Sequence, residues 1–184
     1  QVQKPKLNPR LSSVTSAELK KILDKELGFN LQALENIPIE DLLEKIRTYI
    51  DEKFNWIPTS NFRKDLDINY LLRSYQKDGK YSGTCKGVST LLCSFCEVLG
   101  LPARILKGDL IINDEAGEED AGTHAWPEDY ITQIRRWIPV EFVTGAFVTY
   151  PPTELAYYVL MNNLFPPQGK SLSIKVDYTD PAKN

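Results

Sequence analysis

Three residues of this sequence have side chains and spacing suited to covalent chemistry on a carbonyl group. Cys85 is one of three cysteines, the single histidine, His124, lies 39 residues after it, and Glu141 follows 17 residues later. A thiol, an imidazole that can take its proton and a carboxylate that can orient the imidazole are the parts of a general nucleophilic site. These residues are the candidates that the fold must bring together.

Cys85 is expected to begin a helix over residues 85–99. Apolar residues recur there at intervals of three and four, Gly100 and Pro102 mark the end, and Thr84 is a suitable N-cap. A thiol in the first turn of a helix lies at the positive end of the dipole, which favours the nucleophilic thiolate, and the N–H groups there can stabilise an oxyanion. From position alone, a small buried cysteine with a packing role fits about as well.

The other two cysteines, Cys93 and Cys96, form a C-x-x-C pair in the middle of the same helix. Redox pairs work at a helix N-terminus, and a rise of about 12 Å separates Cys85 from Cys93, too far for both to bind one zinc ion. We therefore expect the pair to pack in the core. With one histidine and an odd number of cysteines, we expect no metal site, no cofactor and no disulfide framework.

His124 and Glu141 are expected on neighbouring antiparallel strands, residues 124–131 and 136–143. A turn centred on residues 132–133 would pair residue 124 with residue 141. Imidazole and carboxylate would then be cross-strand neighbours on one face of the sheet. A slip of one residue in this register would turn one of them to the other face.

Further side chains near this pair could contribute to the site. Glu128 is the alternative acid, because side chains alternate along a strand and Glu128 shares the face of His124. Trp126, Glu128 and Trp137 are candidates for lining a substrate groove, although aromatic residues of this kind more often pack in a core.

Residues 113–120 contain five acidic residues shortly before His124. A calcium loop or a field that attracts cationic amines would be a functional role, but the spacing is not that of an EF-hand. A solvated hairpin loop is the favoured interpretation.

Three segments resemble motifs of the transglutaminase-like domain, within the papain-like cysteine enzyme superfamily. Gly83-Thr84-Cys85, the helix after it and GLPARILKG at residues 100–108 resemble G-x-C, a helix and G-[IL]-P-A-R-x-x-x-G. HAWPEDY at residues 124–130 resembles H-A-W-x-E-x-Y, and WIPVE at residues 137–141 resembles W-x-P-V-D. The blocks occur in the family's order within residues 81–143.

This resemblance implies roles for the three candidates. Cys85 would be the nucleophile, His124 the base and then the acid, and Glu141 the residue that orients His124, where the family usually has Asp. The resemblance also implies an oxyanion donor besides the Cys85 N–H, for which Trp56 and Gln76 are upstream candidates.

The implied reaction is cysteine-dependent acyl transfer on an amide bond of a protein or peptide substrate, through a thioester. Hydrolysis by a peptidase or amidase is favoured. The alternatives are a transglutaminase, in which an amine resolves the thioester, and a non-catalytic binding or assembly module that keeps the fold.

The composition argues against several other functions. With 184 residues and 42% hydrophobic residues, the chain can close one core. A net charge of −3 without a basic stripe argues against nucleic-acid binding, and no apolar run approaches the ~18 residues of a membrane span. Because the chain begins at Gln1, we expect a processed protein or an excised fragment, with further domains outside it, and lean towards export or the cell envelope.

The elements that must position the candidates predict one α+β domain, and the resemblance implies that its fold is papain-like or transglutaminase-like. Residues 1–14 are expected to be a leader or linker and residues 15–184 the domain, with helices first and then an antiparallel sheet against the Cys85 helix. A capping box at Thr15 to Glu18 is expected to start the first helix. The other expected helices cover residues 39–56, 65–74 and 152–164, and the other strands residues 103–108, 110–113, 146–150 and 171–178.

Overall fold

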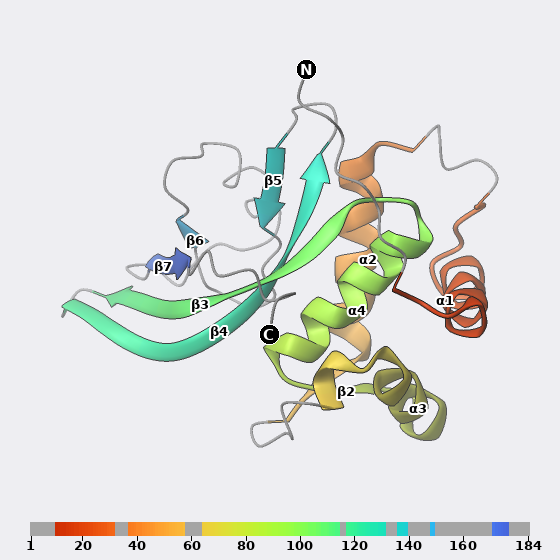
Figure 1. Cartoon of the computed structure of the whole chain (residues 1–184), viewed down its shortest axis with the longest axis horizontal. Coiled ribbons are helices and arrows are strands. Elements are labelled where there is room, and N and C mark those ends of the chain that lie inside the picture. Colours follow the sequence, from red (N-terminus) through yellow and green to blue (C-terminus); the bar gives the residue numbers. More distant parts are fainter. Residues whose placement is uncertain are drawn as a thin grey trace.

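A computed structural model describes residues 10–31, 37–57, 64–114, 117–131, 136–139, 148–149 and 171–176. Helices lie on one side and a curved sheet on the other, so the fold is α+β (Figure 1). The helices are α1 (Ser13–Lys25), α2 (Ile39–Lys53), α3 (Ile68–Asp78) and α4 (Cys85–Val98). The strands are β1 (Phe54–Trp56), β2 (Tyr81–Gly83), β3 (Ala103–Asp114), β4 (Gly117–Ile131), β5 (Arg136–Pro139), β6 (Val148–Thr149) and β7 (Ser171–Val176).

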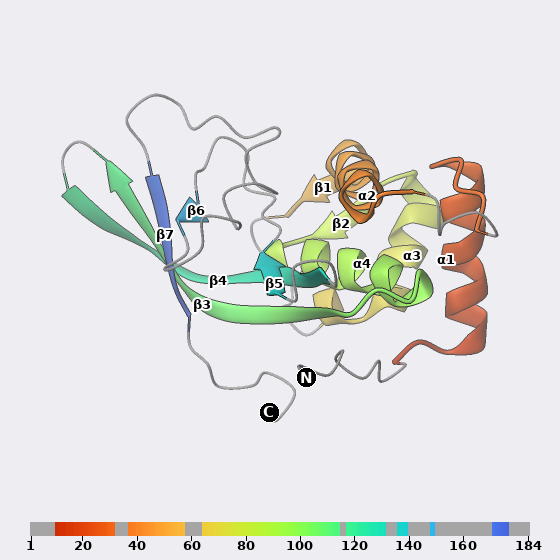
Figure 2. The same ribbon diagram turned by 90° about the horizontal axis from the view of Figure 1, so that it is seen from above.

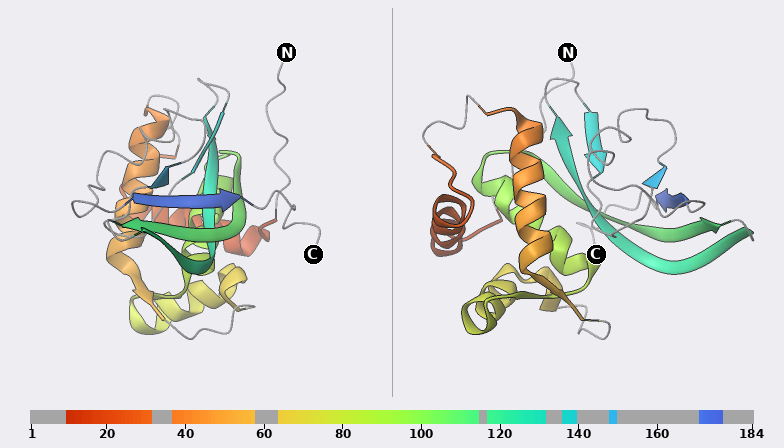
Figure 3. Two further views of the ribbon diagram at one scale, coloured as in Figure 1. Left: turned by 90° about the vertical axis from the view of Figure 1, so that its left-hand side faces the viewer. Right: turned by 180° about the vertical axis from the view of Figure 1, so that it is seen from behind.

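Helix α4 is the centre of the described structure. It contacts α1, α2 and α3 as well as β3 and β4, and Figure 3 shows the other helices around it with the sheet beyond. Its interior residues are apolar or small, and Leu91, Leu92 and Phe95 are fully buried. The predicted helix from Cys85 is thus confirmed. It ends at Val98, and Gly100 follows with a φ of +72°, a left-handed conformation suited to glycine.

Helix α1 begins three residues earlier than its expected capping box. Ser12 is the N-cap, and its hydroxyl accepts the N–H of Thr15 across 3.1 Å. Just before it, the N–H groups of Arg10 and Leu11 donate to a carboxylate oxygen of Glu97 at the end of α4. The expected leader therefore extended too far, because residues 10–14 already belong to the folded part.

Helix α2 is shorter than expected at its C-terminal end. Its apolar stripe is buried as predicted, but it ends at Lys53, and Phe54 begins β1. The strand pairs in parallel with β2, which the sequence pattern did not predict. Three residues of an apolar stripe cannot distinguish the last turn of a helix from a short strand.

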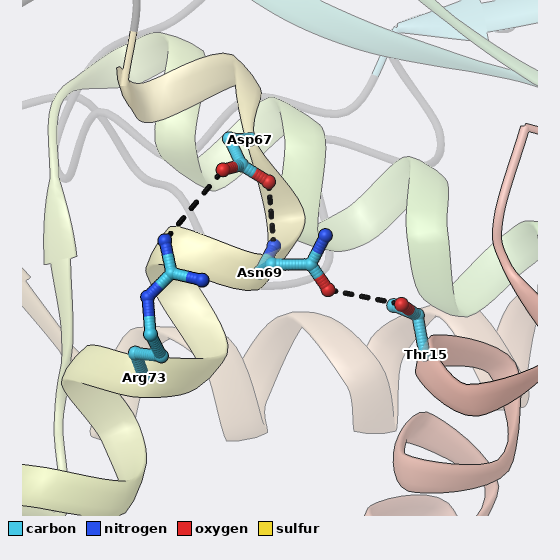
Figure 4. A network of polar contacts seen from close by, with 4 residues as sticks. All are labelled: Thr15, Asp67, Asn69 and Arg73. Atoms are coloured by element: carbon cyan, nitrogen blue, oxygen red, sulfur yellow. Dashed lines mark hydrogen bonds and ion pairs between the residues drawn. The ribbon is translucent and has the colours of Figure 1, made fainter.

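Helix α3 begins three residues later than expected, after a 3-10 turn at Lys64–Leu66. Asp67 caps it by accepting the N–H of Asn69 at 2.9 Å, and its other oxygen faces Arg73 at 3.7 Å. Figure 4 shows how Asn69 continues this network to α1, because its side-chain oxygen accepts the Thr15 hydroxyl at 2.9 Å. The network ties the start of α3 to α1.

The main sheet has the order β5-β4-β3-β7-β6. Its pairs are antiparallel as expected, except that β6 and β7 pair in parallel. The two strands expected at residues 103–108 and 110–113 form one continuous strand, β3. The described strands β5, β6 and β7 are shorter than the expected strands, and the helix expected at residues 152–164 lies outside the described residues.

Strands β3 and β4 form a long hairpin that projects away from the helices (Figures 1 and 2). Only residues 115 and 116 separate the two strands, so the acidic segment is mostly strand and not the loop that we expected. Asp114 ends β3, and Glu118, Glu119 and Asp120 lie in β4. The acidic residues therefore mark the far end of the hairpin.

Candidate functional site

Cys85 is the first residue of α4, and β2 leads directly into it. The helix begins where the Thr84 carbonyl accepts the N–H of Val88 at 3.1 Å, so Thr84 has the predicted N-cap position, although its hydroxyl makes no capping bond. Strand β1 lies beside β2, and the N–H of Ile57 donates to the Gly83 carbonyl at 2.9 Å. Cys85 is half-buried and is not disulfide-bonded.

Two contacts define how α4 lies on β4. Ser89, one turn after Cys85, places its hydroxyl 3.4 Å from the carbonyl oxygen of Ala125. Near the other end of the helix, the thiol of Cys96 lies 3.2 Å from Oδ1 of Asp129. The rise between the two helix residues is about 10 Å and that between the two strand residues about 13 Å. Helix and strand therefore run side by side in the same direction.

His124 lies in β4, directly before Ala125, and its backbone pairs with that of Gly108 in β3. His124 directly precedes Ala125, and Cys85 lies one helical turn before Ser89. Both residues therefore lie at the same end of the contact between α4 and β4. Cys85 and His124 thus each lie close in sequence to the contact between Ser89 and Ala125, and their pairing stays a prediction.

The register between β4 and β5 differs from the predicted one by two residues. Glu128 pairs with Pro139 and Ile131 with Arg136, so four residues separate the paired ends and not two. A two-residue hairpin favours Asn-Gly or a similar pair that accepts positive φ, and Thr132-Gln133 is not such a pair. A slip of two residues preserves the face of every side chain. Glu141 itself lies outside the described residues.

Glu128 is engaged in an ion pair with β3. Its Oε2 accepts from Nε and Nη2 of Arg104 at 2.8 and 2.7 Å, and the guanidinium stacks on the ring of Trp137 at 4.2 Å. The cluster joins three adjacent strands and fixes their register around the candidate site.

The expected groove residues are mostly interior. Trp126 is 1% and Glu128 2% exposed, so neither side chain lines an open groove, and this part of the prediction is corrected. Both lie where β4 is covered, and the alternation pattern alone does not distinguish a covered face from an open one. Trp137 is partly exposed and packs edge-on against Tyr130.

The two oxyanion candidates lie in different places. Trp56 pairs with Gly83, two residues before Cys85; the residue is 47% exposed, and its indole packs against Phe54. Gln76 lies on α3, where its amide nitrogen donates to Glu18 of α1. The structure therefore brings the backbone of Trp56, and not the side chain of Gln76, close to the start of α4.

Cys96 is fully buried in the core, as we predicted, whereas Cys93 is only partly buried. Burial is the main cause that raises the pKa of both thiols, and the charge of Asp129 raises them further. Burial also raises the pKa of Asp129 to about 7, and the Cys96 thiol partly opposes this shift. Sequence reasoning missed Asp129, whose only signal was its position on the strand beside a cysteine helix.

Ser89 was also missed. The available signal was a serine four residues after Cys85, on a helix that the apolar pattern predicts to be buried. A buried hydroxyl needs a hydrogen-bond partner, which such a serine must find nearby. Within the described part of the chain, no group of three metal-ligating side chains is arranged to hold an ion. In the same part, no helix has the length and apolar character needed to cross a lipid bilayer.

Comparison with known families gives one decisive match. The family model of the transglutaminase-like superfamily matches residues 27–142, which is more than half of the chain. This chain belongs to the transglutaminase-like superfamily. The matched range of this superfamily contains all of α4 and β4 and the positions of all three candidate residues. A comparison with curated proteins gave no match.

Several solved structures are similar to this superfamily member at low identity. A candidate cysteine protease of Cytophaga hutchinsonii is 21% identical, with a TM-score of 0.48 over 69% of this chain and 37% of its own. The periplasmic domain of TgpA from Pseudomonas aeruginosa is 17% identical, with a TM-score of 0.48 over 73% of this chain and 45% of its own. A TGase is 19% identical, with a TM-score of 0.46 over 80% of this chain and 38% of its own. The chain spans less than half the length of these structures.

Proposed function

We propose that this domain hydrolyses an amide bond of a protein or peptide through a cysteine thioester. Cys85 is the nucleophile, His124 the general base and acid, and Glu141 the residue that orients His124. The observation that carries the proposal is the seating of α4 on β4. Ser89 contacts Ala125 one turn beyond Cys85 and one residue beyond His124. Membership of the transglutaminase-like superfamily supports the same assignment.

In the first step, the Cys85 sulfur attacks the carbonyl carbon and a C–S bond forms. The thiol proton passes to His124 and then to the leaving nitrogen as the C–N bond breaks, which releases ammonia or an amine. The Cys85 N–H and the indole N–H of Trp56 are the proposed donors to the oxyanion, in keeping with the pairing of Trp56 with Gly83. Water, activated by His124, then resolves the thioester.

The role of Glu141 depends on the register of β5. The ladder between β4 and β5 is described only as far as the pair of Glu128 with Pro139. Glu128, the alternative acid, is engaged with Arg104, so Glu141 is retained as the proposed partner of His124.

The experiment that tests the proposal uses a glutamine-containing peptide library and a labelled primary amine, with Cys85→Ala as the matched inactive variant. We expect peptide cleavage or ammonia release that depends on Cys85, without incorporation of the label. Incorporation of the amine would instead assign transglutaminase activity. Binding of peptides by both proteins without any turnover would assign a non-catalytic binding module and contradict the proposal.

A further inference from the structure

Ser89 lies between α4 and β4, the two elements that carry Cys85 and His124. Its side chain is 1% exposed, and its hydroxyl lies 2.8 Å from the carbonyl oxygen of Cys85 and 3.4 Å from that of Ala125. One acceptor belongs to the proposed nucleophile itself. The other belongs to the residue directly after His124. The Ser89 side chain thus contacts the main chain of α4 at Cys85 and the main chain of β4 next to His124.

We propose that Ser89 is a positioning residue that sets the separation of Cys85 and His124. The inference rests on the proposed function, because it requires these two residues to act as a pair. The hydroxyl has one hydrogen, which it gives to the closer Cys85 carbonyl and shares with the Ala125 carbonyl in a three-centred bond. A shift of α4 along or away from β4 would lengthen the second contact in a buried place, where a carbonyl needs its donor.

The packing around Ser89 supports this role. Ala125 is 4% exposed, so the contact between its carbonyl and Ser89 is shielded from water. Cys85 and Ser89 lie on adjacent turns of one rigid helix. The distance between α4 and β4 that Ser89 maintains at Ala125 therefore also determines where the first turn, with Cys85, lies relative to β4. At the far end of α4, the bond of Cys96 to Asp129 holds the same two elements together, so Ser89 controls the end that bears the site.

The chain offers a closely matched control in Ser94. It lies on the same helix, is 6% exposed, and donates to the carbonyl of Thr90 at 2.7 Å, the same bond back along the helix that Ser89 makes. The difference between the two serines is the additional contact of Ser89 with β4. Ser89→Ala and Ser94→Ala therefore remove the same intrahelical bond, but only the first also removes a link between α4 and β4.

The test measures the rate at which iodoacetamide alkylates Cys85 in the full chain, from pH 5 to pH 9, with the site identified by peptide mass. We expect Ser89→Ala to slow alkylation at least tenfold near pH 6.5 and to move its pH profile towards that of an ordinary thiol. Ser94→Ala should stay within twofold of the wild type. Thermal unfolding of both variants shows that the comparison is between folded proteins.

A double variant separates positioning from a general loss of structure. If Ser89 acts through the pair, adding Ser89→Ala to His124→Ala causes no further slowing. Equal slowing in both backgrounds, or a Ser89→Ala profile like that of the wild type, would overturn the inference. Ser89→Thr keeps the hydroxyl and should retain a rate near that of the wild type. If Ser89→Ala does not fold, slow alkylation in a folded Ser89→Thr protein would overturn it.

The same data distinguish the failure of this inference from failure of the proposed function. Should wild-type Cys85 react no faster than an ordinary thiol and ignore His124→Ala, the catalytic pair itself is absent. Should wild-type Cys85 react fast in a His124-dependent way while Ser89→Ala changes nothing, the pair exists and Ser89 does not position it.

Discussion

The thiol of Cys96 donates to Oδ1 of Asp129 across 3.2 Å in the buried contact between α4 and β4. Asp129 is 1% exposed, and burial raises its pKa to about 7. On α4, the thiol pKa values of Cys93 and Cys96 are raised above the ordinary range. On β4, the charge of the neighbouring Glu128 raises the pKa of Asp129 further. A group of this kind makes the stability of the fold depend on pH.

The raised pKa of Asp129 predicts that the free energy of unfolding falls as the pH rises from about 4 to about 7. In that interval the native state holds the Asp129 proton, while the unfolded chain, with an ordinary pKa of 3.8, has lost it. The free energy of unfolding should therefore fall by up to about 1.4 kcal/mol per pH unit from this group, and the loss is complete above the native pKa. Asp129→Asn should remove this slope, as measured by urea unfolding between pH 5 and pH 8.

The exposed Asp78 provides the control, because Asp78→Asn should leave the slope unchanged. Curves of equal slope for wild type and Asp129→Asn would show that Asp129 is ionised in the native state throughout this range. The slope, and not the absolute stability, is the informative quantity, since the buried amide of the variant carries its own cost.

The ion pair between Arg104 and Glu128 should contribute measurably to stability. The Glu128 side chain is 3% exposed, and Arg104 also stacks on Trp137. Glu128→Gln should lower the free energy of unfolding by about 1–3 kcal/mol, because it weakens a charge-assisted bond in a mostly buried place. The exposed pair of Lys77 with Asp78 should contribute at most about 0.5 kcal/mol. Equal effects of Glu128→Gln and Asp78→Asn in chemical denaturation would contradict this assignment.

Gly87 allows β1 to approach the first turns of α4 closely. A Cβ atom there would lie 3.2 Å from Cζ of Phe54 and 3.4 Å from Cδ2 of Leu71, and the Phe54 ring packs against Trp56. Gly87→Ala should therefore destabilise the wild type by about 1 kcal/mol, although alanine favours helices.

Removing the Phe54 ring should reverse this effect. In a Phe54→Leu background, we expect Gly87→Ala to be neutral or stabilising, with a coupling of at least about 1 kcal/mol in a double-mutant cycle. Additive effects of the two substitutions would mean that the ring moves aside without cost. Tryptophan fluorescence would report whether Trp56 shifts with it.

The sequence was most informative where several signals agreed. Helix α4 has a periodic apolar face, a start at Cys85 and a glycine stop, and it was predicted within one residue. The start of α1 was less clear, because Ser12, Ser13, Thr15 and Ser16 can each serve as an N-cap and only tertiary contacts select among them. Strand β1 was missed because its partner, β2, is 25 residues away in the chain.

The sequence suggests the residue types of the candidate site but not their supporting contacts. The motif around Cys85 favours this thiol as the proposed nucleophile, and the single histidine leaves one choice for its proposed partner. The roles of Ser89 and Asp129 depend on where α4 lies against β4, which no local pattern specifies. The register of β5 depended on the length of a turn, and the two-residue turn that we assumed lacks the residues that such turns favour.

The most direct test of the central claim compares the three thiols of the native protein in one experiment. Iodoacetamide at neutral pH, followed by peptide mass analysis, should alkylate Cys85, in the first turn of α4, at least 100-fold faster than Cys93 or Cys96, whose thiol pKa values are raised. His124→Ala should remove most of this advantage. Slow alkylation of all three thiols at similar rates, unchanged by His124→Ala, would contradict the account.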